Sequence, residues 1–279
     1  MNKIAIQGIQ GSNHYIVAQN YFGATTNIKE CLSFDVLVAA IVSGDSEVGI
    51  MALENTIAGS IIPNYALIDQ HHLTIIGEYY LNIHHHLMAL ENQKIEDIKE
   101  VYSHPMALLQ CKDFFKKHPH IKLIEDVDTA DVAKRISEKN LRHVAAIAPK
   151  IAADIFKLSV IEDEIQTITN NATRFVIVEK STAASSVALN TDQTNKASLK
   201  FELDHKRGSL AAILNVMSDC KLNLTKIQSL PKIESPWKYA FFVDVTFSEY
   251  KNYTKAKAII EIMALDFKVL GAYKNGRNE

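Results

Sequence analysis

Apolar residues follow two alternating patterns along the first 180 positions of the chain. Short, mainly apolar runs such as 3–7 and 143–148 have the length and the Ile, Val and Ala content of strands buried on both faces. Elsewhere, as in 13–22, apolar residues recur every three or four positions, which predicts helices with one buried face. Strands that alternate with helices of this length predict α/β layers with mainly parallel sheets. The same patterns predict helices at 34–42, 95–101, 106–117 and 129–139, and strands at 47–53, 121–127 and 176–178.

The alternation stops at residues 181–196, which are rich in Ser, Thr, Ala and Asn and contain few large apolar groups. Such a composition predicts a linker. The βαββαβ order that follows is that of a ferredoxin-like unit of about 80 residues. We therefore expect two domains, at 1–180 and 197–279. The six elements of the second domain are predicted at 197–203, 209–220, 224–230, 238–247, 254–265 and 268–273.

Composition and charge narrow the kinds of partner that the protein can have. Of its 279 residues, 47% are hydrophobic and 22% charged, as in a folded protein with a substantial core. The net charge of −2 provides no overall field that would recruit nucleic acid or a membrane surface. No apolar run approaches the ~20 residues needed to span a bilayer, and the first residues show no signal-peptide pattern. Cys31, Cys111 and Cys220 form no motif, so we expect a cytoplasmic protein.

A glycine turn, Gly8 to Gly11, separates the first predicted strand from the first predicted helix. The N-terminus of that helix, at Ser12, offers backbone N–H groups and a partial positive charge to a carboxylate or phosphate. The third glycine of a dinucleotide-binding fingerprint is missing. By itself, the segment is better explained as a tight turn with Ser12 or Asn13 as the helix N-cap.

Two further polar segments stand at the ends of predicted elements. Asn55 and Thr56 directly follow a core strand, where ligands bind in open α/β sheets, although a turn satisfied by its own side chains explains them equally well. Ser103 suits an N-cap before Pro105, and Gln110 follows Ser103 by two helical turns, so both can point toward one spot. Capping alone does not account for Gln110.

The fourth segment places Thr173 beside Arg174 at the start of a predicted strand. A hydroxyl donor would there adjoin a guanidinium whose planar fork matches a carboxylate, although most such pairs at strand ends have no function. His84 and His86 share one face of another apparent strand while His85 faces away. No Cys or carboxylate pattern completes a metal site with them, so we expect no metal.

Taken in order and at their spacing, these segments resemble the prephenate dehydratase family. ALENTIAGSIIPNYALI resembles its Glu-Asn-(Ser/Thr) segment, VYSHPMALLQC its Ser-His-Pro…Gln-Cys segment, and NNATRFVIV its Thr-Arg-Phe signature. RGSLAAIL and LNLTKIQSLP resemble the ACT domain, a small ligand-binding domain that commonly follows. The chain departs from the family's usual residues at three places: Ser12-Asn13-His14 for Thr-Phe-Ser, Met106 for Gln, and Gln228-Ser229-Leu230-Pro231 for Glu-Ser-Arg-Pro.

The resemblance implies a catalytic domain with the type-2 periplasmic-binding-protein fold. Two α/β lobes, roughly 1–75 plus 166–180 and 76–165, would hold the substrate between them. It further implies decarboxylative dehydration of prephenate to phenylpyruvate, water and CO2 in phenylalanine biosynthesis, without a cofactor. Thr173 would stabilise the departing hydroxide. Asn55, Ser103 and Gln110 would orient the substrate, and the implied substrate-binding residues are Arg174, Thr56, Phe175 and Ser12.

The resemblance also implies feedback inhibition by phenylalanine, bound between paired ACT domains of a homodimer or homotetramer. Leu230 stands where the family commonly has an Arg, which weakens the implied regulation. The implied effector-binding residues are Gly208, Ser209, Leu210, Ala211, Asn223, Gln228, Ser229, Leu230 and Pro231. Two other functions share the implied fold: a solute-binding protein, and a catalytically inactive chain that only senses an amino acid.

Overall fold

The chain folds into two compact units. The computed structural model describes residues 3–181, 192–232 and 235–277. One unit comprises Met1–Ile61 with Tyr80–Phe175, and the other comprises Ile62–Tyr79 with Val176–Glu279. None of the described helices is long and apolar enough to cross a membrane.

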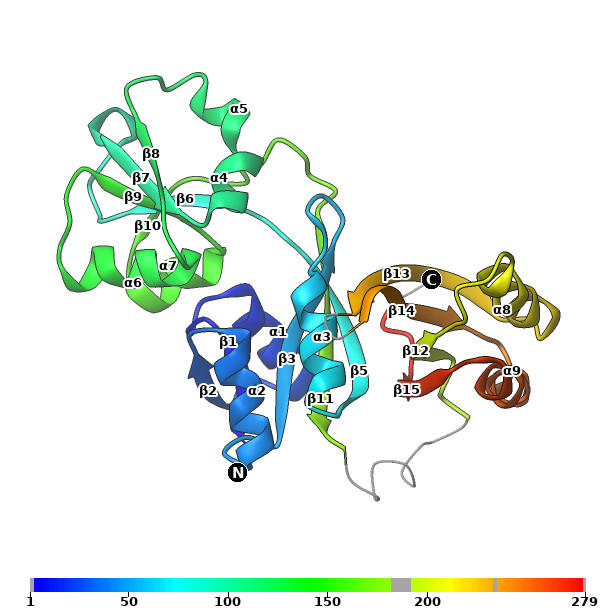
Figure 1. Ribbon diagram of the computed structural model, residues 1–279. Helices are drawn as coiled ribbons and strands as arrows, with labels where there is room; N and C mark the ends of the chain where they lie inside the picture. Colours follow the sequence, from blue (N-terminus) through cyan, green and yellow to red (C-terminus); the bar gives the residue numbers. More distant parts are fainter. Residues whose placement is uncertain (1–2, 182–191, 233–234, 278–279) are drawn as a thin grey trace. The chain divides into compact units, whose positions relative to one another are not determined.

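In the first lobe of the first unit, three neighbouring strands of a sheet run parallel (Figure 1). The middle one of the three pairs with a strand on either side, so that Ile4 lies opposite both Ile28 and Val48. The full sheet has the order β2-β1-β3-β11-β5, with the short β4 on β3. The strands are β1 (Lys3–Gln7), β2 (Asn27–Cys31), β3 (Val48–Asn55), β4 (Gly59–Ser60), β5 (Leu73–Asn82) and β11 (Ala172–Lys180), and the lobe's helices are α1 (Asn13–Phe22) and α2 (Phe34–Ser43).

The second lobe contains a five-stranded sheet of order β10-β6-β9-β7-β8. Alternate residues of β9 face two apolar clusters: Ile147 faces the cluster that includes Leu108 of α4, and Ala146 faces the one that includes Val132 of α6. The strands are β6 (His86–Ala89), β7 (Glu100–Ser103), β8 (Lys122–Glu125), β9 (Val144–Ala148) and β10 (Ser159–Glu162), and the helices are α4 (Pro105–Gln110), α5 (Lys112–Phe115), α6 (Thr129–Glu138) and α7 (Lys150–Phe156).

Three predictions for this lobe are wrong. The helix expected at 106–117 is two short helices that meet at Cys111, and residues 95–101 form one 3-10 turn (Ile95–Asp97) and then β7. His104, not Ser103, caps α4, because its Nδ1 accepts the N–H of Met106 at 3.2 Å. Pro105 disfavours helical backbone in the residue before it, so residue 104 stays extended and Ser103 remains in the strand.

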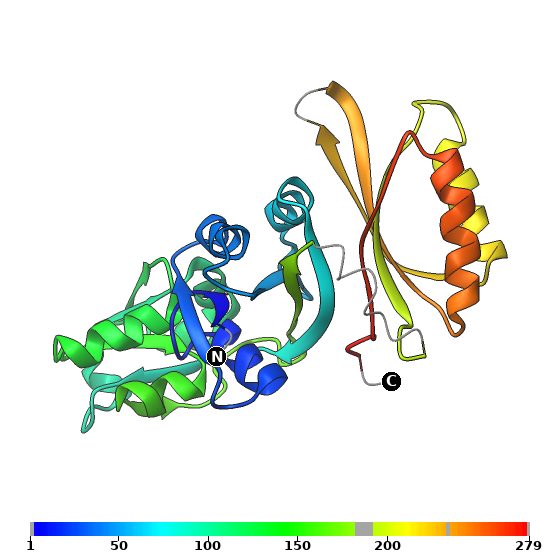
Figure 2. The same cartoon turned by 90° about the horizontal axis from the view of Figure 1, so that it is seen from below.

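The second unit contains an antiparallel sheet of order β13-β14-β12-β15, in the predicted βαββαβ order of elements. Figure 2 shows α8 and α9 side by side on one face of this sheet, where Phe201, Ile213 and Ile260 share one core. Of the predicted linker, residues 182–191 lie outside the described residues, and Lys196 already belongs to β12. The elements are β12 (Lys196–Glu202), α8 (Ser209–Asp219), β13 (Asn223–Lys232), β14 (Ser235–Thr246), α9 (Tyr250–Met263) and β15 (Asp266–Tyr273).

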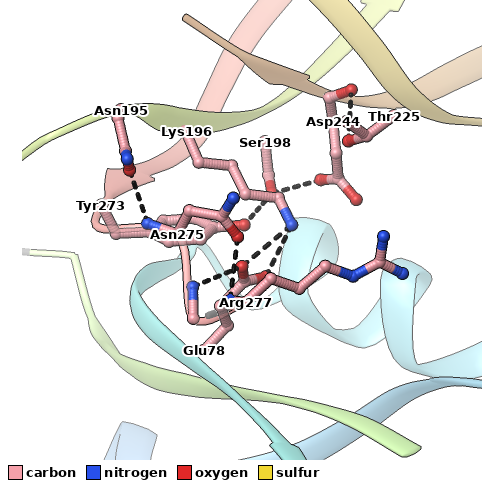
Figure 3. A network of polar contacts seen from close by, with 10 residues as sticks. Glu78, Asn195, Lys196, Ser198, Thr225, Asp244, Tyr273, Asn275 and Arg277 are labelled. Atoms are coloured by element: carbon pink, nitrogen blue, oxygen red, sulfur yellow. Dashed lines mark hydrogen bonds and ion pairs between the residues drawn. The ribbon is translucent and has the colours of Figure 1, made fainter. Parts of the chain in front are cut away.

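The other face of this sheet carries several polar side chains beside Phe242 and lies against α3 (Ile62–Gln70) and the following part of β5. Because side chains alternate along β12, Lys196, Ser198 and Lys200 project away from the helices. The ammonium of Lys196 lies 2.9 Å from each carboxylate oxygen of Glu78, and the two residues are only 3% and 4% exposed (Figure 3).

Neighbouring polar groups complete this buried network. The backbone N–H of Gly276 donates to the Glu78 carboxylate at 2.9 Å. Ser198 Oγ contacts Tyr273 Oη at 2.6 Å and donates to Asp244 Oδ1 at 2.5 Å, as Figure 3 shows. A charge in such a position is stable only while its partners remain, because the desolvation of each ion is offset by the other.

We expect Lys196→Met to destabilise the second unit by about 3–5 kcal/mol, since it leaves the Glu78 carboxylate buried without its counterion. The double variant Glu78→Leu/Lys196→Met should recover most of the loss, because it removes both charges. Urea unfolding measures both effects. Lys206→Met is the matched control, because Lys206 pairs with Asp204 in solvent and its loss should leave the midpoint unchanged. A Lys196→Met midpoint equal to that of the wild type would contradict the structural role of this ion pair.

Candidate active site

The side-chain amide of Asn55, at the end of β3, has a fixed orientation. Its Oδ1 accepts the backbone N–H groups of Ile57 at 2.9 Å and Ala58 at 2.8 Å. Because only the oxygen can accept these bonds, Nδ2 must point the other way. There it donates to Asn171 Oδ1 at 2.7 Å and to Thr173 Oγ1 at 2.9 Å, and Ala172 O lies 3.3 Å away.

The same polarity continues into the second lobe. Since Asn171 Oδ1 is an acceptor, its Nδ2 is the donor to Gln110 Oε1, at 2.9 Å. Gln110 lies at the end of α4, and its Oε1 is also 2.7 Å from His85 Nε2. Amides from both lobes and the segment between them therefore form one hydrogen-bonded chain.

Thr173 stands at one end of this chain, on β11. Its side-chain oxygen accepts a hydrogen from Asn55, which leaves its own hydroxyl hydrogen for an acceptor other than Asn55. A donor held in place before its acceptor arrives stabilises developing negative charge effectively.

Thr56, Ser12 and Phe175 support this arrangement by packing and turn geometry. Thr56 Oγ1 accepts the N–H of Ala172 at 3.0 Å, which ties the loop after β3 to the start of β11. Ser12 caps α1 by accepting the N–H of Tyr15 at 3.2 Å. Phe175 is buried, with its ring centroid 4.9 Å from that of His14.

Two predicted site residues, Ser103 and Arg174, are not brought into the chain. Ser103 is fully buried, and its hydroxyl donates to the carbonyl of Ile147 in β9 at 2.8 Å. Arg174 is 3% exposed, and the alternation of β11 directs its side chain to the opposite face from Thr173.

The glycine turn brings the first lobe close to the second. Gly8 and Gly11 have φ of 88° and 92°, which favours glycine. A Cβ on Gly8 would lie 2.7 Å from Asp128 Oδ2, and one on Gly11 would lie 3.3 Å from Ala152 and Phe156. Asp128 caps α6, and burial raises the pKa of its carboxyl group above the ordinary range. The first turn of α1 therefore begins where the lobes meet.

The sequence offered little that would identify Asn171 and His85 as members of the chain. Asn171 is one of two adjacent asparagines, and nothing local distinguishes it from Asn170.

His84 and His86 each have Nδ1 near a carboxylate, at 3.1 Å from Glu164 and 2.9 Å from Asp163. Among the residues that the structure describes, no three or more His, Cys, Asp or Glu gather in a way that could hold a metal ion.

Three of the nine predicted effector residues line hollows of the second unit. Ser209 and Leu210 line a hollow of about 180 Å³ at the start of α8, where Gly208 has φ of 87°. Asn223 lines another hollow, of about 770 Å³, just beyond the end of that helix. Ala211 lies in the first turn of α8, and Gln228, Ser229, Leu230 and Pro231 lie on β13.

These features define a two-lobed α/β protein. Its candidate site is built from uncharged hydrogen-bonding groups: a chain of side-chain amides joins the two lobes and ends at the hydroxyl of Thr173. The model of the family described as prephenate dehydratase matches residues 4–183. The chain belongs to the prephenate dehydratase family.

Known proteins resemble the chain well beyond that segment. A chloroplastic arogenate dehydratase/prephenate dehydratase of Arabidopsis thaliana is 32% identical, over 97% of this chain and 72% of its own length. The structure of an Arthrobacter aurescens prephenate dehydratase in complex with L-Phe has a TM-score of 0.87 at 22% identity, covering 98% of this chain and 90% of its own. A structure described as GqqA, a novel type of quorum quenching acylases, has the same TM-score and identity and covers 98% of each chain. At this identity, the two structures show the fold alone.

The burial of His14 predicts how the stability of the first unit depends on pH. The residue is buried, its Nε2 has no hydrogen-bond partner among the described residues, and burial lowers its pKa to about 3. Unfolded histidine titrates near 6.5, so between these values the unfolded state binds the additional proton. The contribution of His14 to stability is therefore complete above pH 6.5 and lost as the pH falls.

Between pH 7 and pH 5, we expect the free energy of unfolding to fall by about 2 kcal/mol less in His14→Leu than in the wild type. Urea unfolding at the two pH values measures the difference. The exposed His120 provides the control, because His120→Gln should leave the pH dependence as it is. An unchanged pH dependence in His14→Leu would show that His14 is protonated in the folded state.

Proposed function

We propose that the protein catalyses the decarboxylative dehydration of prephenate to phenylpyruvate, water and CO2, in phenylalanine biosynthesis. The observation that carries this proposal is the Thr173 hydroxyl, whose oxygen accepts Asn55 Nδ2 at 2.9 Å while its hydrogen remains available to a ligand. Residues 1–180 would form the catalytic domain and residues 197–279 an ACT domain.

The chemistry requires little acid strength from the protein. As the bond from the ring to the carboxylate breaks, CO2 leaves and the bonding electrons enter the ring. The C–O bond then breaks, and hydroxide leaves as the ring becomes aromatic and takes a proton from solvent to give water. Aromatisation supplies the driving force, so a hydrogen bond to the departing oxygen is enough. A threonine hydroxyl is a very weak acid, which favours stabilisation of the developing charge over full proton transfer.

The other members of the chain would hold this donor in place. The hydrogen bond from Asn55 polarises the Thr173 hydroxyl and strengthens it as a donor. Gln110 and Asn171 would keep the Asn55 amide from rotating. The N-terminal turn of α1 at Ser12 carries the partial positive charge that suits a substrate carboxylate. With Arg174 and Ser103 buried elsewhere, we assign them to support of their own strands.

Arogenate is a second candidate substrate within the same reaction class. It carries an amino group where prephenate has a keto group, and the Arabidopsis relative is named for both activities. A solute-binding protein or a purely sensing chain would bind such a ligand without converting it. Purified protein mixed with each compound, with release of phenylpyruvate or phenylalanine followed, separates these possibilities.

We expect Thr173→Ala to lower kcat on prephenate by ~10²-fold or more, as when one oxyanion-type donor is removed. Thr173→Ser should retain far more activity because it keeps the hydroxyl. Steady-state assays of both variants, with thermal unfolding as the folding control, measure the difference. Near-wild-type turnover by folded Thr173→Ala would remove this hydroxyl from the mechanism.

Phenylalanine would bind to the second unit as a feedback inhibitor, in a homodimer or homotetramer. Ser209 and Asn223 lie at opposite ends of α8, which at 11 residues is roughly 16 Å long. One phenylalanine cannot reach both within a single chain. Two copies could bring the first turn of one α8 beside the Asn223 of the other, with the N–H groups of α8 on the ligand carboxylate and the Asn223 oxygen on its ammonium.

Calorimetry and activity assays with millimolar phenylalanine should show binding and inhibition by the full-length wild type. Asn223→Ala should bind phenylalanine at least ~10-fold more weakly, because an ammonium loses its acceptor. Its kcat without phenylalanine should equal that of the wild type. Absence of both heat and inhibition in the wild type would leave the second unit with a structural role only.

A further inference from the structure

His85 is held rigidly inside the second lobe. The residue is 5% exposed, and its backbone N–H donates to the Gln166 side chain at 2.9 Å. Its carbonyl accepts the N–H of Ile165 at 2.9 Å. With both backbone groups bound, the imidazole has little freedom, and its Nε2 lies 2.7 Å from Gln110 Oε1.

The direction of the amide chain determines which nitrogen of His85 carries the hydrogen. Asn55 has its oxygen on two backbone N–H groups, which makes Asn171 Oδ1 an acceptor and Asn171 Nδ2 a donor. The Gln110 atom that receives this donor is therefore the oxygen. An oxygen cannot donate, so His85 Nε2 must be protonated, and this tautomer is assigned from the network.

Gln110 Oε1 thus receives two hydrogens, from Asn171 and from His85. Without the second donor, only Asn171 would hold the Gln110 amide in this direction. Reversal of Gln110 would put its NH2 against the NH2 of Asn171, and a turn of Asn171 to relieve that clash would put its NH2 against the NH2 of Asn55. The contact between Asn55 and the Thr173 hydroxyl would then lose the support of its neighbours.

We infer that His85 is a positioning residue for the proposed dehydration: its Nε2–H holds the Gln110 and Asn171 amides in the direction that the turn after β3 sets for Asn55, and thereby supports the hydrogen bond from Asn55 to the Thr173 hydroxyl. This inference rests on the proposed function. Burial lowers the pKa of His85 below its ordinary value, in keeping with a neutral ring. His85 touches no reacting atom, so its loss should appear in kcat more than in KM.

Two substitutions separate this role from simple packing. In His85→Gln, the amide nitrogen is as many bonds from Cα as the imidazole Nε2 and can donate to Gln110. In His85→Asn, the amide nitrogen falls at the position of Nδ1 and cannot reach it. We expect His85→Asn to lower kcat ~10-fold or more with KM changed less than ~3-fold, and His85→Gln to recover kcat to within ~3-fold of the wild type.

The neighbouring His84 is the matched control, because it lies near Glu164 instead of Gln110. His84→Asn and His84→Gln should not differ in kcat. In the background of Gln110→Leu, His85→Asn should cost no further activity, since the two residues act through one contact. Thermal unfolding shows whether each variant is folded.

Equal kcat losses in His85→Asn and His85→Gln, or additive losses with Gln110→Leu, would overturn the inference while leaving the proposed function in place. Nitrogen-15 spectra, with His85→Gln used to assign the signals, should show the ring protonated at Nε2. A ring protonated only at Nδ1 would also overturn it, whatever the kinetics. Absence of turnover by the wild type on both prephenate and arogenate would instead contradict the proposed function itself.

Discussion

The turn that follows β3 determines the direction of every hydrogen bond in the site. Two backbone N–H groups, of Ile57 and Ala58, take the oxygen of the Asn55 amide, and this local bond leaves only NH2 to face Asn171 and Thr173. Reversing one amide would bury unmatched polar groups at about 1–3 kcal/mol each. The orientation of one amide, set within residues 55–58, thus determines the orientation of side-chain amides in both lobes.

The site residues also lie close in sequence to a segment that belongs to the second unit. Residues 56–61 join Asn55 to α3, and β5 leads on to His85, so the segment 62–79 has site residues just before and just after it. That segment belongs to the second unit, where Asp69 contacts Lys268 at 2.9 Å and Glu78 contacts Lys196 at the same distance. The chain therefore passes between the two units at points close in sequence to Asn55 and His85.

The sequence predicted the elements of this fold well where one periodicity governed a whole element. Residues 3–7 and 13–22 form the predicted strand and helix with unchanged bounds, and the βαββαβ order of the second unit is confirmed. Prediction failed at 103–117, where Ser103 stays in β7 and the predicted helix breaks at Cys111. A repeat of apolar positions does not encode such interruptions.

The site, too, could be predicted only in part, because its contacts join residues that are far apart in the sequence. Asn55 and Thr173 were proposed from a family resemblance, and the structure joins them by a hydrogen bond across 118 positions. Gln110 is similarly bound to Asn171, 61 positions away. Contacts of this kind depend on how two lobes close on each other, which no local pattern in the sequence contains. Asn171 and His85 could therefore be recognised only from coordinates.

The neutrality of the whole chain of groups follows from the reaction proposed for it. A substrate with two carboxylates that expels hydroxide would bind a cationic donor tightly before reaction as well as during it, and uniform binding does not raise kcat. The hydrogen bond from a neutral hydroxyl becomes strongest when the departing oxygen acquires negative charge. Its weakness as an acid is then no disadvantage, provided that it is already aimed, because preorganised dipoles need no rearrangement at the moment of bond breaking. Rigid neutral amides supply that aim, which explains why orientation, more than charge, is what the structure fixes most firmly around Thr173.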